Sequence, residues 1–81
     1  NNIDEQIVKL IALRGQFVKQ AAKFKKDSDA VKAPKRVEEV INKVKDLAKS
    51  TSANEEILEN VYRTMINSFI KAEMKEFEKL K

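Results

Sequence analysis

The 81-residue sequence contains no histidine and no cysteine, and it has a single glycine and a single proline. Without histidine, His-based catalytic triads and the usual His-rich metal sites are excluded, and without cysteine disulfides play no part. No apolar run approaches the ~20 residues of a transmembrane span, and the first residues do not form a signal-peptide pattern. The scarcity of turn residues beside 37% charged and 42% hydrophobic residues predicts an all-helical chain.

The net charge of +4 is spread along the chain rather than gathered on one face. Lysines alternate with acidic residues, as on ordinary solvated helix faces, whereas a nucleic-acid-binding protein usually concentrates its cations. The nearest approach to a cluster lies at residues 23–26 and is followed at once by Asp27 and Asp29. We therefore expect no nucleic-acid partner and no membrane partner, while the basic balance favours attraction of an anionic small molecule.

Apolar residues recur at three- and four-residue spacings in three segments, which predicts three helices. The first runs from about residue 3 to 26, and residues 27–33 form a break and a short loop. Pro34 suits the first turn of the second helix, which has about 15 residues. Either Ser52 or Asn54 caps the third helix, which runs to the C-terminus. The expected order within one domain, residues 1–81, is long, short, long.

These unequal lengths predict a homodimer. The outer helices would be about 36–40 Å long and the middle one about 22 Å. One short helix cannot cover two long apolar stripes, and small soluble proteins rarely leave so much apolar surface exposed.

Three charged residues fall on apolar faces, where an unpaired charge costs several kcal/mol. Arg14 lies seven residues after Ile7 on the stripe of the first helix, and Lys25 follows eleven residues later. On one helix these two cations would point almost the same way, roughly 16 Å apart, with small residues between them. Glu73 lies on the apolar face of the third helix, where its pKa would be raised and its carboxyl could donate a hydrogen bond. The spacing predicts a site for a small ligand with two carboxylates.

Two of the three arginines, Arg14 and Arg36, suggest the same site, because the guanidinium fork suits bidentate carboxylate binding. Arg36 lies in the first turn of the second helix, where the helix start also favours anions. Arg63 falls off the main stripe of the third helix and is expected to be solvated.

Each of these charges also has an ordinary explanation. Arg14 could reach the edge of the stripe or pair across a dimer interface. Lys25 could be a charge near a helix end, and Glu73 could form a structural ion pair with either cation. From the residues alone both explanations stay open.

Two stretches carry a family resemblance. Residues 3–14 read IDxxIxxLIxLR, and this pattern resembles the first helix of the all-helical chorismate mutases. Residues 17–25 (FVKxAAKFK) and 33–37 (APKRV) are similar to their salicylate-pathway relative, isochorismate-pyruvate lyase. The resemblance covers nearly the whole chain.

This resemblance implies an intertwined homodimer, expected to be cytoplasmic, with each active site lined by both chains and no cofactor or metal. It places Arg14 on a substrate carboxylate and Lys25 on a carboxylate and the ether oxygen. Arg36 matches another site arginine, and Glu73 matches a Gln or Glu that touches the ether oxygen. The implied reaction is the pericyclic rearrangement of chorismate to prephenate.

Departures from the family keep a second activity open. The mutases usually carry Glu where Val37 stands, in contact with the 4-hydroxyl of chorismate, and many have a small polar residue where Phe69 stands. Isochorismate lacks that hydroxyl, so Val37 and Phe69 favour the lyase, which yields salicylate and pyruvate, while Glu73 is more typical of a mutase. The family also expects an upstream arginine, which would precede Asn1, so a chain that truly began there should show impaired activity. A helical dimerisation module without catalysis is the remaining alternative.

Overall fold

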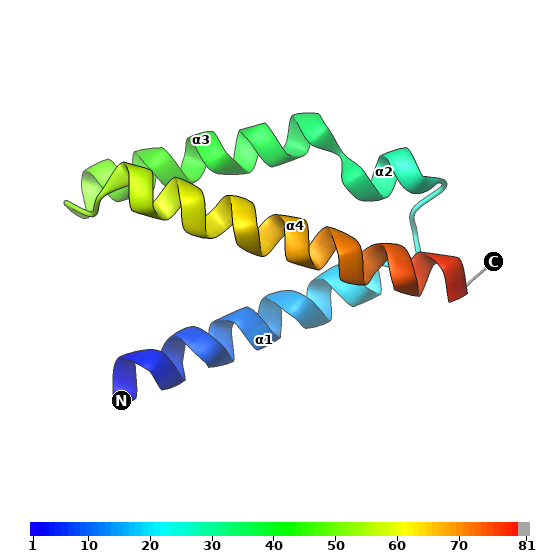
Figure 1. Ribbon diagram of the computed structural model, residues 1–81, viewed down its shortest axis with the longest axis horizontal. Coiled ribbons are helices and arrows are strands. Elements are labelled where there is room, and N and C mark those ends of the chain that lie inside the picture. Colours follow the sequence, from blue (N-terminus) through cyan, green and yellow to red (C-terminus); the bar gives the residue numbers. More distant parts are fainter. Residues whose placement is uncertain (80–81) are drawn as a thin grey trace.

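Four helices make up the computed structural model, which describes residues 1–79. They are α1 (Asn2–Ala22), α2 (Ser28–Lys32), α3 (Pro34–Ser50) and α4 (Glu55–Lys79), shown in Figure 1. The predicted all-α class and the long, short, long order of the three main helices are confirmed. The expected continuation of the last helix through residues 80–81 lies outside the described residues.

The helix starts follow local hydrogen bonds to side chains and the preference of proline for a first turn. Asn1 caps α1, because its side-chain oxygen accepts from the backbone N–H of Ile3 at 2.9 Å. Pro34 opens α3, as predicted. Asn54 caps α4 by accepting from the N–H of Ile57 at 3.0 Å. Of the two proposed caps for this helix, Asn54 is therefore the one used, and Ser52 takes a positive φ of 58° in the turn.

The prediction for residues 23–33 was wrong in two respects. The first helix ends at Ala22, so Lys25 lies beyond it, and the N–H groups of Lys23, Phe24 and Lys25 bond to carbonyls three residues back, which tightens the last turn. Residues 28–32 then form α2, because the extended Asp27 accepts from the N–H of Ala30 at 2.8 Å and so caps a new helix. Asp27 was read only as a helix breaker.

Helix α4 lies at the centre of the fold, with α1 and α3 along opposite sides and α2 near its C-terminal part (Figure 1). The molecule is thin, with extents of 44 × 29 × 15 Å. Its buried apolar residues come mostly from α3 and from the segments beside the C-terminal part of α4: Ala22, Val31, Ile41, Val44, Ala48 and Phe77. No helix within residues 1–79 is both long and apolar enough to cross a membrane.

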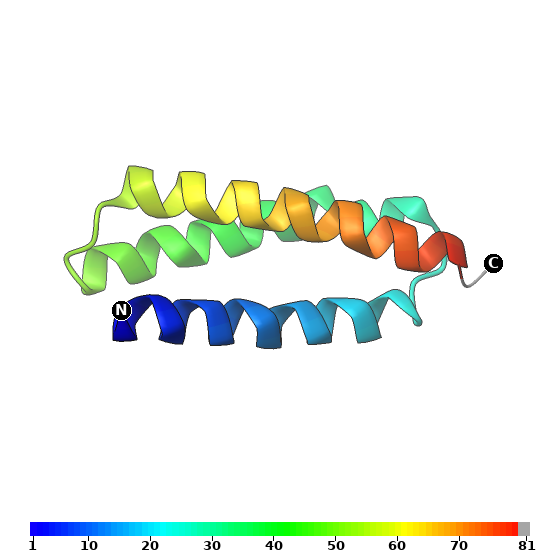
Figure 2. The same ribbon diagram turned by 60° about the horizontal axis from the view of Figure 1, so that its bottom comes forward.

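The apolar stripe of α1 is exposed over most of its length. Ile3, Leu10 and Phe17 keep 65%, 66% and 63% of their surface exposed. Figure 1 shows why: the N-terminal end of α1 diverges from α4, the helix against which α1 packs farther along the chain, and Figure 2 shows α1 running as a separate rod beside α3 and α4. Leu47 in α3 and Val61 in α4 are also more than half exposed. The described part of the chain therefore does not cover its own apolar stripes.

Arg63 joins α3 to α4, and the prediction that it is simply solvated was wrong. Its two terminal nitrogens donate to the two carboxylate oxygens of Glu38 at 2.8 and 2.9 Å, and its Nε donates to Glu59 at 2.8 Å. Lys45 also pairs with Glu59, at 3.1 Å. The hydrogen bonds from Arg63 hold the pKa of both glutamates below their usual range, helped at Glu59 by Lys45.

Candidate functional site

A pocket of about 460 Å³ lies where all four helices contribute side chains, and its size suits a small organic ligand. All six residues singled out from the sequence line it: Arg14, Lys25, Arg36, Val37, Phe69 and Glu73. Lys32 of α2 adds a fourth cation. We call this the cationic pocket, after Arg14, Lys25, Lys32 and Arg36. The structure thus brings together residues that are up to 59 positions apart in the chain (14 to 73).

The half-buried Arg14 lies in the middle of α1, with its guanidinium carbon 5.5 Å from the ring centroid of Tyr62 on α4. It forms no ion pair or hydrogen bond with any described side chain, in contrast to Arg63. The N–H donors of a guanidinium lie in its plane, so contact with a ring face leaves them available. Arg14 can therefore offer its donors to a ligand in the pocket.

Glu73 is the buried acid of the pocket. Only 7% of its surface is exposed, and its Oε2 atom is buried without a hydrogen-bond partner among the described residues. Burial raises the pKa of the Glu73 carboxyl, and the positive charge of Lys25 opposes part of this effect. No ion pair joins Glu73 to Arg14 or Lys25 within the part of the chain described, so the structural ion pair considered from the sequence is not present.

The start of α3 brings Arg36 and Val37 to the pocket. Ala33 has a left-handed backbone (φ 37°, ψ 63°) and gives α3 no side-chain cap, so the first N–H groups of this helix keep their partial positive charge. Arg36, three residues after Ala33, is exposed, forms no ion pair with a described side chain, and lines the pocket. Both features add to the attraction for an anion.

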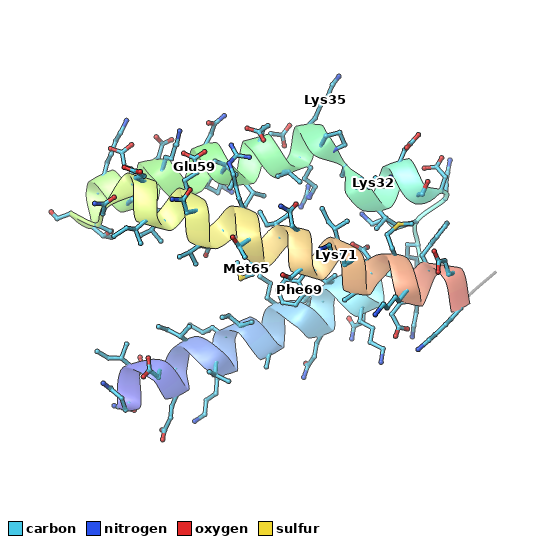
Figure 3. The ribbon with its side chains drawn as sticks, in the orientation of Figure 1. Lys32, Lys35, Glu59, Met65, Phe69 and Lys71 are labelled. Atoms are coloured by element: carbon cyan, nitrogen blue, oxygen red, sulfur yellow. The ribbon has the colours of Figure 1, made fainter. Side chains whose placement is uncertain are left out.

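Phe69 forms part of an apolar wall, and its ring packs against the backbone of α1. Figure 3 shows it on the side of α4 that faces α1. A Cβ built on Gly15 would lie 3.1 Å from Cε1 of Phe69, so the missing side chain of Gly15 permits this contact. The apolar part of the lining is completed by aliphatic residues of α1, α3 and α4: Leu10, Leu13, Val18, Val40, Ile66 and Ile70.

Two site features were missed from the sequence. Lys32 was placed in a loop, and the signal that could have found it was Asp27 as the cap of a short helix. Tyr62 lies four residues before Ile66, which lies three before Phe69, so the helical spacing places Tyr62 on the face of α4 that meets α1. Its contact with Arg14 depends on how α1 crosses α4, which spacing does not give.

The arrangement is suited to binding and orienting an anion. Four cations and one buried carboxyl line the pocket together with aliphatic and aromatic side chains, and no hydroxyl or thiol is among the lining residues. Among residues 1–79, no three acidic side chains gather where they could hold a metal ion. The pocket offers a dicarboxylate several charged donors together with one carboxyl that retains its proton more readily than usual.

In a comparison with protein families, the family model described as chorismate mutase type II matches residues 1–74. Neither the curated proteins nor the solved structures gave a match.

Proposed function

The chain belongs to the chorismate mutase type II family, and from this we propose that it converts chorismate to prephenate in the cationic pocket. The observation that carries the proposal is the set of four cations around the buried Glu73, none of them in an ion pair with a described side chain. Chorismate has two carboxylates and an ether oxygen on which negative charge grows as the reaction proceeds. The pocket offers partners for all three.

In this reaction a C–O bond of the enolpyruvyl ether breaks while a C–C bond forms between its methylene carbon and the ring. Substrate and product have the same atoms, so no nucleophile or leaving group is required. The protein has to hold the enolpyruvyl arm over the ring, which removes much of the entropic barrier. We assign the two carboxylates of chorismate to Arg14 and Arg36.

Lys25 and Glu73 would act on the breaking bond. An ammonium group and a protonated carboxyl can both donate hydrogen bonds to the ether oxygen, and such bonds strengthen as negative charge develops there. The raised pKa of Glu73 supports this role, because the carboxyl donates only while it is protonated. Lys25 would also contact a carboxylate.

A second copy of the chain is the proposed partner. The exposed stripe of α1, with Leu47 and Val61, supports a homodimer that covers these residues. Sedimentation at micromolar concentration should give a dimer for the wild type and a monomer for Ile7→Glu, while the solvent-side change Lys9→Glu should leave the dimer intact. A monomeric wild type would contradict the proposal.

The activity is tested by supplying chorismate and isochorismate separately and identifying the products by chromatography. Prephenate from chorismate, lost in Arg14→Ala and kept in Lys35→Ala, is the expected result. If neither compound is converted, but chorismate raises the melting temperature of the wild type and not of Arg14→Ala, the chain binds the ligand without catalysis. If neither effect occurs, a dimerisation module is the better explanation.

A second candidate is isochorismate-pyruvate lyase, and Val37 and Phe69 favour it. Both are apolar and line the pocket, so they offer no partner to the 4-hydroxyl that chorismate has and isochorismate lacks. In that reaction a ring hydrogen moves to the methylene of the enolpyruvyl arm as the C–O bond breaks, which leaves salicylate and pyruvate. The same positioning of two carboxylates serves both reactions, and the products decide between them.

A further inference from the structure

Tyr62 contacts Arg14, one of the residues that line the pocket, and the proposed reaction gives this contact no role. We propose that Tyr62 is a positioning residue, whose ring face holds the guanidinium of Arg14 so that its N–H donors face the ligand. The inference rests on the proposed function to the extent that Arg14 binds a substrate carboxylate. The contact itself is independent of which compound is bound.

The geometry around Arg14 carries the first step. Its guanidinium carbon lies over the ring of Tyr62, 5.5 Å from the centroid. Arg14 lines the pocket, whereas Tyr62 is not among the lining residues. The ring contact is also the one polar or charged interaction that the side chain of Arg14 makes within residues 1–79. The ring of Tyr62 is therefore what holds the charged end of Arg14 when no ligand is bound.

The chemistry of the guanidinium explains why a ring is suited to this task. A carboxylate partner occupies the in-plane donors, as Glu38 and Glu59 do at Arg63. An aromatic face instead attracts the cation electrostatically and leaves the in-plane donors free. Arg63 is thus bound through the in-plane edge of its guanidinium, in a contact that joins two helices. Arg14 is held through the face of its guanidinium, which leaves its in-plane N–H donors available for a carboxylate.

The separation of α1 and α4 where they cross sets the distance between the guanidinium of Arg14 and the ring of Tyr62. Tyr62 lies on the same face of α4 as Phe69, which meets α1 at Gly15, the residue that follows Arg14. Because Gly15 has no side chain, the ring of Phe69 reaches the backbone of α1. The two contacts involve consecutive residues of α1, Arg14 and Gly15, and two residues of α4 that lie about two turns apart, Tyr62 and Phe69.

Loss of the ring should affect binding more than chemistry. A freed arginine samples many rotamers, and the ligand must order it again in both the ground state and the transition state. We expect Tyr62→Leu and Tyr62→Met to raise KM about 3- to 10-fold with kcat nearly unchanged. Tyr62→Phe keeps the aromatic face and should behave like the wild type. If the hydroxyl of Tyr62 acted, Tyr62→Phe would raise KM as well. If Tyr62 served only the stability of the fold, the variants would melt at lower temperature with KM unchanged.

The contact can be tested without turnover, by NMR of the arginine Nε–Hε groups. The chain has three arginines, so three signals are expected, and Arg14→Lys identifies the one of interest. Protons over an aromatic face are shifted upfield by the ring current. The Arg14 signal should be upfield in the wild type and Tyr62→Phe and should return to the ordinary position in Tyr62→Leu and Tyr62→Met. The Arg63 signal, whose Nε donates to Glu59, is the internal control.

The outcomes separate this inference from the proposed function. An Arg14 signal that is the same in all four proteins overturns the contact, whether or not chorismate is converted. A shifted signal with equal KM values in an active wild type and Tyr62→Leu overturns the positioning role. If the wild type converts neither compound, addition of chorismate should still move the Arg14 signal in the wild type at lower concentration than in Tyr62→Met, and equal concentrations would overturn the inference. Circular dichroism and melting of both nonaromatic variants establish that they fold.

Discussion

Gly15 and Phe69 meet where α1 crosses α4, so closely that a Cβ on Gly15 would lie 3.1 Å from Cε1 of the Phe69 ring. Such a distance is tighter than ordinary van der Waals contact, and Phe69 would have to yield by a few tenths of an ångström. The ring can do so because it lines the cationic pocket and is only partly buried. This pair therefore couples the packing of two helices to the shape of the site.

Gly15→Ala should maintain or raise the stability of the protein and lower its affinity for the substrate. Alanine in a helix interior is favoured over glycine by up to about 1 kcal/mol, part of which the shifted ring consumes. The displaced Phe69 narrows the pocket, so we expect a melting temperature equal to or above that of the wild type and a KM several-fold higher. Thermal melts and steady-state kinetics check this. A large loss of stability would mean that Phe69 cannot move.

Glu73 should make the stability of the protein fall as pH rises. Its pKa is raised in the folded state, so above the unfolded pKa the unfolded chain gives up this proton more readily than the folded protein does. The slope of the unfolding free energy against pH is then negative between the two pKa values. Glu73→Gln removes this contribution, and its melting temperature relative to the wild type should be higher at pH 8 than at pH 4. An unchanged difference across that range would contradict the raised pKa.

The same proton should control activity. With Glu73 as hydrogen-bond donor, kcat/KM is highest below its folded pKa and falls as pH rises through it. A Glu73→Gln variant keeps a donor at every pH, so its profile should be flat over the same range. The measurement is a pH series of initial rates for both proteins. If the two profiles have the same shape, another group titrates.

Lys32 and Lys35 offer a matched pair for testing the charge of the pocket. Lys32 lines it from α2, while Lys35 points away from α4 in Figure 3 and is not among the lining residues. Both are exposed lysines, so Lys32→Met and Lys35→Met remove the same net charge. We expect kcat/KM to fall about 5-fold for Lys32→Met and to change little for Lys35→Met.

Salt provides the control for that pair. At 0.5 M salt the screening length is only a few ångströms, so the gap between the two variants should shrink. Equal losses at low salt would show that overall charge, rather than the position of Lys32, attracts the ligand.

The main helices of this fold could be predicted because their signals are local. The three- and four-residue spacing of apolar residues, Pro34 at a helix start and Asn54 as a cap are each decided within one or two turns. The charged residues on apolar faces, Arg14 and Glu73, marked the site because burial of charge requires a reason. The residues alone also singled out Lys25 and Arg36, whereas Val37 and Phe69 were found only through the family resemblance, and all six line one pocket.

Other features depended on how helices meet, which local spacing does not encode. The start of α2 follows from the cap at Asp27, where a helix breaker and a helix start have the same residue type. Arg63 was misjudged because its partner Glu38 is 25 positions away on another helix. The contact of Arg14 with Tyr62 likewise exists only once α1 and α4 cross.

The four cations of the pocket also bear on the lifetime of the protein. Held together by the fold, they repel one another, and a bound dianion relieves that repulsion only in the folded state. A ligand at 100 times its Kd would add about 2.7 kcal/mol to the free energy of unfolding. Since proteases degrade unfolded chains, the supply of substrate would then set how much of this protein survives.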